Sequence, residues 1–193
     1  MLCGSVLAVR IDVSTIKDTK GASVEVQLSE AMGSLSAAGR ELTCSGPVDV
    51  RAKVTNTGHG AMLVQGRARA SLEAACDRCL APFDLDVVSK FEGHYWKGRE
   101  DGRPARAYGG DGADGGDELE YHGDFVDIGP EVRESLALAI PIRLVCSEEC
   151  RGLCPSCGKN LNEGPCDCPA PPGDVRLAGL LDLCRPGRAG DRD

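Results

Sequence analysis

The sequence predicts an α+β fold: mainly an antiparallel β meander, with one central helix and a cysteine-rich, zinc-binding C-terminal segment. Three observations lead to this prediction. Apolar and polar residues alternate between Val48 and Trp96, an amphipathic stripe follows a helix-start signal near Pro130, and six cysteines lie within Cys146 to Cys168. A two-residue period indicates strands with one wet face, whereas a period of about 3.6 residues indicates a helix.

Three strands make up the predicted meander. They cover residues 48–54, 62–74 and 83–96, where every second residue is mostly apolar and the residues between are mostly polar or charged. Residues 56–60, Asn-Thr-Gly-His-Gly, form the first turn, and the Cys76–Cys79 pair lies between the second and third strands. Turn residues between alternating segments are typical of hairpins. The cysteine pair is therefore expected at the second turn.

The meander belongs to a larger β-rich part, residues 1–97. Weaker patterns at 6–13 and 24–28 each predict a strand, and 29–40 is ambiguous. Residues 98–117 are rich in Gly, Asp and Arg and contain few apolar residues. Such a segment buries too little apolar surface to offset its ordering entropy, so we expect a disordered acidic and Gly-rich loop.

Residues 118–185 are expected to hold the helix, the zinc-binding segment and a short closing helix, with a tail at 186–193 and one domain overall. Residues 118–126 are expected to re-enter the sheet. The helix is predicted to start at 127–130, which has Pro at its first helical position, and to end before Pro141. Its apolar stripe consists of Val132, Leu136, Ala139 and Ile140. The closing helix has Asp174 as its cap and the stripe Leu177, Leu180, Leu181 and Cys184.

Eight of the 11 cysteines fall into four close pairs, which predicts two structural zinc sites. Zinc is held by four thiolates at about 2.3 Å, and short spacings allow both sulfurs of a pair to reach one ion. One self-contained C-x2-C-x8-C-x-C unit defines the knuckle site, made of Cys154, Cys157, Cys166 and Cys168. The remaining pairs define the inter-segment site, made of Cys76, Cys79, Cys146 and Cys150. Closed four-thiolate shells leave no position for water, so both zinc ions are expected to be structural.

Other interpretations of the cysteines remain open at this point. Disulfides, reduced thiols, a redox couple, and iron or an iron–sulfur cluster all use cysteine pairs. The grouping of the inter-segment site is inferred across about 70 residues of chain and is not a local pattern. Cys3, Cys44 and Cys184 have no close partner in sequence and are expected to be small apolar side chains.

The composition, and the motifs that the sequence lacks, narrow the classes of function that this protein could have. The formal net charge is −8, which argues against a generally basic nucleic-acid-binding surface. No secretory signal or membrane-length apolar run is visible, so a cytoplasmic protein without a membrane partner is expected. The three histidines, His59, His94 and His122, are scattered, and no P-loop or G-x-G-x-x-G motif occurs. We therefore expect no enzyme and no small-molecule substrate.

One charge pattern suggests a contact with RNA. Arg51, Arg67 and Lys90 lie on the polar face of the meander, and turns centred near Gly58–His59 and Arg78–Cys79 would place them opposite one another. Like charges side by side on a sheet are unfavourable unless an anion binds there, and an RNA phosphate backbone would fit. The alternative is a solvated face diluted by the acidic residues Asp49, Glu73, Asp84 and Asp86.

Several motifs resemble the YceD family, the large ribosomal RNA subunit accumulation proteins. They are CDRCLAPF (76–83), VDIGPEVRESLALAIPIRLVC (126–146), CRGLCPSCGKNLNEGPCDC (150–168) and DVRLAGLLDL (174–183). The last motif has Asp-Val-Arg where the family often has Asp-Pro-Arg. The resemblance implies a cytoplasmic bacterial protein, or a plastid relative, without known catalytic activity. Some members lack the knuckle site, which supports the grouping of the inter-segment cysteines.

Together these observations predict a non-catalytic factor that supports large-subunit ribosomal RNA accumulation. Its expected partner is ribosomal RNA or a large-subunit assembly protein, and the process itself is implied only by the resemblance. Two other functions stay open. One is a thiol redox protein that uses Cys76 and Cys79, although a catalytic C-x-x-C commonly lies at a helix N-terminus and this one is flanked by strands. The other is a zinc-ribbon adaptor for a protein partner.

Overall fold

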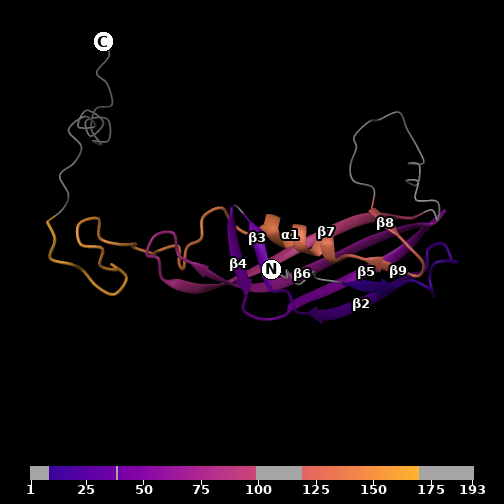
Figure 1. Ribbon diagram of the computed structural model, residues 1–193, viewed down its shortest axis with the longest axis horizontal. Coiled ribbons are helices and arrows are strands. Elements are labelled where there is room, and N and C mark those ends of the chain that lie inside the picture. The colour runs from indigo at the N-terminus through magenta and orange to yellow at the C-terminus, as the bar shows by residue number, and fades with distance from the viewer. Residues whose placement is uncertain (1–8, 38, 99–118, 170–193) are drawn as a thin grey trace, which may run out of the picture.

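The computed structural model describes residues 9–37, 39–98 and 119–169 (Figure 1). The predicted loop beyond Gly98, the closing helix and tail, and Cys3 and Cys184 lie outside the described residues. Within the described part, the chain forms nine strands and one helix. They are β1 (Arg10–Asp12), β2 (Ser23–Glu30), β3 (Ser34–Ala37), β4 (Arg40–Cys44), β5 (Val48–Gly58), β6 (Ala61–Ala75), β7 (Pro82–Lys97), β8 (Leu119–Tyr121), β9 (Phe125–Asp127) and α1 (Gly129–Ala139).

The long antiparallel strands β5, β6 and β7 form the predicted meander, which is confirmed. The turn between β5 and β6 contains His59 and Gly60, with φ values of 56° and 77°. Two successive positive φ values are typical of a type I′ hairpin turn, whose twist matches that of the flanking strands. The apolar residues of β6 that the alternation predicts to be inside face the core, with Val64 and Leu72 both 0% exposed.

Strand β6 is the centre of a seven-stranded sheet, and it is longer than β5 and β4, which share one of its edges. One edge of β6 pairs with β7 along its whole length, from Ala61↔Trp96 to Ala75↔Pro82. The other edge is shared: β5 pairs with the first part of β6, and β4 pairs with Leu72 and Glu73. Strand β2 extends the sheet beyond β5, and β3 extends it beyond β4.

Two short strands follow a different pattern from the rest. Strand β8 re-enters the sheet as predicted for residues 118–126, but it pairs with β7 in parallel. A parallel pair needs a crossover of a dozen or more residues, and more than a dozen separate β7 from β8. Strand β9 instead pairs with β1 in a separate two-stranded sheet, through Ile11↔Val126. The segment therefore divides between the two sheets.

Helix α1 packs against the sheet beside β7 and β3 (Figure 1). Val132 and Leu136 are fully buried, and Asp127 Oδ1 accepts the N–H of Gly129 at 3.0 Å at the helix start. The prediction that Ala139 belongs to the buried stripe is wrong, because this residue is exposed. The helix ends at Ala139, and Ile140 has extended backbone and fills the last core position instead.

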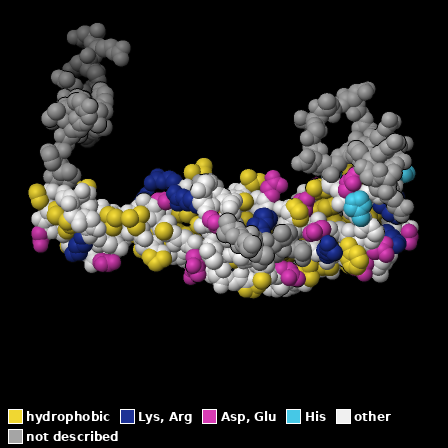
Figure 2. All heavy atoms as spheres, in the orientation of Figure 1, with side chains coloured by type: hydrophobic (Ala, Val, Ile, Leu, Met, Phe, Trp, Pro, Cys, Tyr) yellow, Lys and Arg dark blue, Asp and Glu magenta, His cyan; other side chains and the backbone are white. Residues whose placement is uncertain are grey.

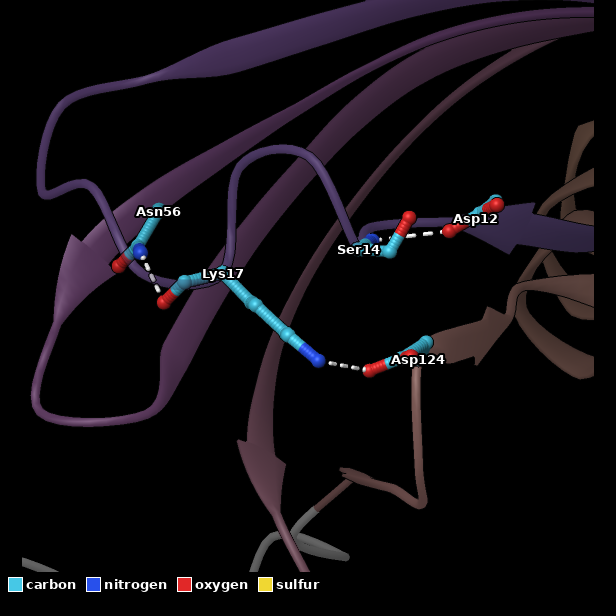
Figure 3. Close-up of polar contacts among 5 residues, drawn as sticks. All are labelled: Asp12, Ser14, Lys17, Asn56 and Asp124. Carbon is cyan, nitrogen blue, oxygen red and sulfur yellow. Dashed lines mark hydrogen bonds and ion pairs between the residues drawn. The ribbon is translucent and has the colours of Figure 1, made fainter.

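The loop between β1 and β2 is held by polar contacts of the buried Asn56 and of the partly exposed Lys17 (Figure 3). Asn56 Nδ2 donates to the carbonyls of Ile16 and Lys17 at 2.8 Å each, and its side chain is buried. Lys17 Nζ forms an ion pair with Asp124 Oδ1 at 2.5 Å, from the connection between β8 and β9. These bonds connect the end of β5 to the loop between β1 and β2, and that loop to the connection between β8 and β9. Buried polar groups are rarely left without such partners.

The cysteine segment extends beyond the β6–β7 turn at one end of the molecule (Figure 1). α1 spans 11 residues, and the described chain contains no helix with the length and apolar character of a membrane span.

Candidate metal centres

The turn between β6 and β7 presents the first cysteine pair. Cys76 N–H donates to Ala81 O at 2.9 Å, and Leu80 N–H donates to Cys76 O at 2.9 Å. Leu80 has a φ of 59°, which is uncommon outside glycine. These bonds close the turn tightly and bring Cys79 back toward Cys76.

Asp77 and Arg78, between the two cysteines, dock the turn onto the segment that follows α1. Asp77 N–H donates to Leu144 O at 2.7 Å, and Leu144 N–H donates to Asp77 Oδ2 at 2.8 Å. Arg78 Nη1 donates to the carbonyls of Glu148 at 3.2 Å and Cys150 at 2.9 Å. The four bonds bring the second cysteine pair to the first.

The inter-segment site brings its four Sγ atoms within 4.8 Å of one another. Cys76 Sγ lies 3.8 Å from Cys150 Sγ, and Cys79 Sγ lies 3.7 Å from Cys146 Sγ. A disulfide would require about 2.05 Å. Four sulfurs arranged tetrahedrally at about 2.3 Å from a central ion would be about 3.8 Å apart. The spacing therefore fits one tetrahedral ion.

The thiols of the inter-segment site differ in their affinity for protons. Burial opposes ionisation of Cys76, but N–H donors from Cys146, Cys79 and Arg78 outweigh it and lower the pKa of Cys76 to about 6. The adjacent Cys150 thiol, together with burial, raises the pKa of Cys146 to about 12. The Cys76 thiol therefore loses its proton readily, whereas the neighbouring thiols oppose ionisation of Cys146. A divalent cation would remove that opposition.

The knuckle site is built from a compact turn and a second cysteine pair. Its four Sγ atoms also lie within 4.8 Å of one another. Gly158, with a φ of 75°, donates its N–H to Cys154 O at 2.9 Å and so closes the turn. N–H groups of Cys157 and Ser156 lower the pKa of Cys154 to about 6, whereas the Cys157 thiol raises the pKa of Cys168 to about 12.

The two sites touch through one side chain. Asn162 lies in the loop between Cys157 and Cys166, yet its Nδ2 lies 3.3 Å from Cys150 Sγ of the inter-segment site. This N–H donor lowers the pKa of the Cys150 thiol, against the effect of burial. The knuckle loop therefore completes the surroundings of the neighbouring site.

Each four-cysteine group could hold one metal ion. Four thiolates around one tetrahedral ion occupy every position, so neither group offers an open position for a reacting molecule. Cys44, the remaining described cysteine, is half-buried on β4, and it belongs to neither group.

The sheet register places the predicted cationic residues side by side. Arg51 pairs with Arg67 between β5 and β6, and Arg67 pairs with Lys90 between β6 and β7. All three are exposed, and we call them the cationic row. Across the described residues, none of the three forms an ion pair with a carboxylate.

The neighbouring rows are neutralised. Lys53 Nζ lies 3.6 Å from Glu25 Oε1, and Arg69 Nη2 lies 3.0 Å from Asp86 Oδ2. An open concavity of about 500 Å³ runs between the cationic row and the row of Lys53, with Gly66 in its lining. On the face shown in Figure 2, described basic and acidic side chains are mixed. Among these three rows, positive charge without an acidic partner is thus confined to the cationic row.

Sequence reasoning did not identify three residues of the metal centres: Asp77, Arg78 and Asn162. Only their positions in the sequence could have pointed to them, since two lie inside the C-x-x-C motif and one lies inside the knuckle loop. The described histidines lie outside both cysteine groups. His94 Nε2 lies 3.9 Å from Glu92 Oε1, and His122 Nε2 lies 3.8 Å from Glu120 Oε2.

Comparisons with known proteins place the chain in a family. Residues 64–184 match the family model described as large ribosomal RNA subunit accumulation protein YceD. The matched range is more than half of the 193 residues and includes both cysteine groups. The chain is also similar to "Large ribosomal RNA subunit accumulation protein YCED homolog 1, chloroplastic" of Arabidopsis thaliana, with 42% identity over 43 residues. That match covers 22% of this chain and 13% of the relative. No solved structure matches the chain.

Proposed function

The chain belongs to the YceD family, and from this premise we propose that it is a non-catalytic factor that supports accumulation of large-subunit ribosomal RNA by binding RNA in the cytoplasm. The family name supports the process. The observation that supports RNA as the partner is the cationic row, whose members Arg51, Arg67 and Lys90 lie next to one another across three strands.

The cationic row is costly without a ligand. Like charges directly opposite on a sheet destabilise it, whereas Lys53 and Arg69 on neighbouring rows each have an acidic partner. A phosphate backbone would supply the missing negative charge without base recognition. A net charge of −8 would keep binding confined to this row.

Both cysteine groups are proposed to hold zinc in a structural role. Thiolate ligands favour soft or borderline metals, and the Sγ separations of 3.7 and 3.8 Å match a zinc tetrathiolate. The inter-segment zinc would fix the segment after α1 to the β6–β7 turn. Because such sites form only in the folded chain, binding free energy becomes folding free energy. Metal analysis of the purified chain distinguishes zinc from iron.

A thiol redox function is the second candidate, because the pKa of Cys76 is lowered to about 6 by surrounding N–H groups despite burial. The location of the pair argues against it. Cys76 and Cys79 occupy a strand–turn–strand and face two further thiols, a metal-binding arrangement, instead of a helix N-terminus. Reduction of insulin disulfides tests this candidate, and we expect no activity above that of free thiols.

Depletion and complementation test the main proposal. Cells depleted of the protein should lose large subunits in a sucrose gradient and large-subunit RNA by quantification. Complementation with Arg51→Glu/Arg67→Glu should fail, whereas Lys53→Gln should restore both, provided that the variants accumulate to wild-type levels.

A second experiment separates RNA from a protein partner. Capture of the tagged chain with and without nuclease shows whether association with ribosomal particles depends on RNA. Association that survives nuclease and both charge reversals would contradict RNA binding and support a zinc-ribbon adaptor for an assembly protein. An unchanged gradient after depletion would contradict the biogenesis function itself.

A further inference from the structure

Asn162 connects two cysteine groups that the sequence treats as separate. Its backbone lies between Cys157 and Cys166, in the loop of the knuckle site. Its Nδ2 lies 3.3 Å from the sulfur of Cys150, in the inter-segment site. The side-chain amide of Asn162, from one site, thus contacts a cysteine sulfur of the other site.

The Asn162 side chain is held in place by hydrogen bonds at both its oxygen and its nitrogen. Its Oδ1 accepts the N–H of Arg151 at 2.8 Å, and its Nδ2 also donates to Asn160 Oδ1 at 2.9 Å. Leu161 N–H donates to Gly152 O at 2.9 Å. The knuckle loop thus folds back over the residues directly after Cys150, and its geometry depends on both of its ends.

We propose that Asn162 is a positioning residue that couples the two metal centres, so that metal in the knuckle site strengthens metal binding in the inter-segment site. This inference rests on the proposed zinc sites. Metal at the knuckle site fixes both ends of the loop, Cys157 and Cys166. The fixed loop holds the amide donor against the Cys150 thiolate. A donor to a ligating atom typically changes metal affinity by about 10–100-fold.

The coupling must be reciprocal, since a free energy shared by two binding sites acts on both. Metal at the inter-segment site would hold Cys150 in position and so favour the folded knuckle loop. Loss of either metal is then expected to accelerate loss of the other.

Site-resolved alkylation of the zinc-loaded full chain tests the proposal. The chain is exposed to a chelator and a thiol-alkylating reagent, and peptide mass spectrometry gives the modification rate of each cysteine. Asn162→Asp keeps the acceptor for Arg151 N–H but replaces the amide donor with a carboxylate facing Cys150. We expect the inter-segment cysteines to react about tenfold faster. Because the coupling acts on both sites, Cys157 should react faster as well. Glu163→Gln, in the same loop, is the control and should match wild type.

Removing the knuckle ligands provides the second arm. Cys166→Ser/Cys168→Ser should accelerate inter-segment alkylation to a similar extent, and adding Asn162→Asp should give little further increase. If Asn162 only braced the loop through Arg151, Asn162→Asp would behave like wild type, which would overturn the proposal. Independent, additive effects would overturn it as well. Metal content is measured first. A wild-type chain that binds no metal would refute the zinc sites themselves. An Asn162→Asp chain that binds two ions and whose cysteines are modified at wild-type rates would refute only the coupling.

Discussion

Asp77 and Leu144 are joined by a reciprocal pair of hydrogen bonds, with the Asp77 N–H 2.7 Å from the Leu144 carbonyl and the Leu144 N–H 2.8 Å from Asp77 Oδ2. The other carboxylate oxygen, Oδ1, lies 2.7 Å from Arg40 Nη1 on β4. One acidic side chain thus connects the C-x-x-C turn, the segment after α1 and strand β4 of the sheet. The inter-segment site is assembled at this junction.

Asp77 should make docking of this segment sensitive to acid. The Leu144 N–H, and then Arg40, hold the pKa of Asp77 below its ordinary value. A carboxyl whose pKa is lower in the folded state contributes stability above its unfolded pKa of about 3.9, and this contribution disappears as pH falls through the folded value. Asp77→Asn should therefore be less stable than wild type at pH 7, and the difference should shrink below about pH 4.

Chemical denaturation of metal-free protein from pH 7 to 3 measures this difference without interference from metal release. Asp18→Asn, an exposed acid-to-amide change, is the control and should follow wild type at each pH. A difference between Asp77→Asn and wild type that stays constant down to pH 3 would show that the ionised carboxylate is not responsible.

Gly66 should tolerate no side chain. It pairs with Ala52 and Phe91 across three strands, and an added Cβ would lie 2.4 Å from Phe91 Cζ and 2.7 Å from the carbonyl oxygen of Arg51. The ring can tilt, but the backbone oxygen cannot move without disturbing the sheet. Gly66→Ala should lower the free energy of unfolding by about 1–3 kcal/mol.

Gly33 is the matched control for this substitution, since a Cβ there would meet nothing within 4 Å. Gly33→Ala should change the free energy of unfolding by less than about 0.5 kcal/mol in the same denaturant titration. Equal effects at the two positions would mean that crowding at Gly66 is relieved by adjustment of the sheet.

RNA affinity should depend on salt through the cationic row. Each phosphate contact with single-stranded nucleic acid contributes about 0.7 to the slope of log affinity against log salt. Arg67→Gln should therefore weaken binding and reduce that slope by about 0.7. Lys53→Gln should change the slope little, because Lys53 is paired with Glu25. Titrations of labelled single-stranded RNA at several salt concentrations provide both values, and an identical slope for the two variants would count against phosphate contact.

Metal removal should loosen the cysteine segment beyond Leu144, and leave the sheet and the Asp77–Leu144 contact folded. The core of the meander is apolar and independent of the cysteines, whereas segment 144–150 is held at the β6–β7 turn partly by the inter-segment site. A chelator should raise hydrogen exchange at 146–169 and change it little in β5. Cys79→Ser should lower metal content from two ions per chain to one, while Cys44→Ser should leave it unchanged. Increased exchange throughout β5 after chelation would contradict this separation.

Much of the sheet was predictable because its strands are neighbours in sequence. Alternation fixes which face of each strand is buried, and the short turn at His59 brings Arg51 close to Arg67. The exact opposition of Arg51 and Arg67 also depends on the register shift between Asn56 and Gly58, which the sequence pattern does not show. The helix was predictable from Pro130 and its apolar spacing. Its last turn was not, because the exposure of Ala139 depends on where the chain leaves the sheet.

The sequence by itself determined the local elements: alternating strands, the start of α1, and four cysteine pairs at metal-binding spacing. Only the tertiary structure decided how distant parts meet, including the shared edge of β6, the parallel pairing of β8, and the roles of Asp77 and Asn162. The physical reason is that periodicity and turn chemistry act within a few residues. A contact such as that of Asn162 with Cys150 depends on the folded path of two loops and leaves no repeating pattern in the chain.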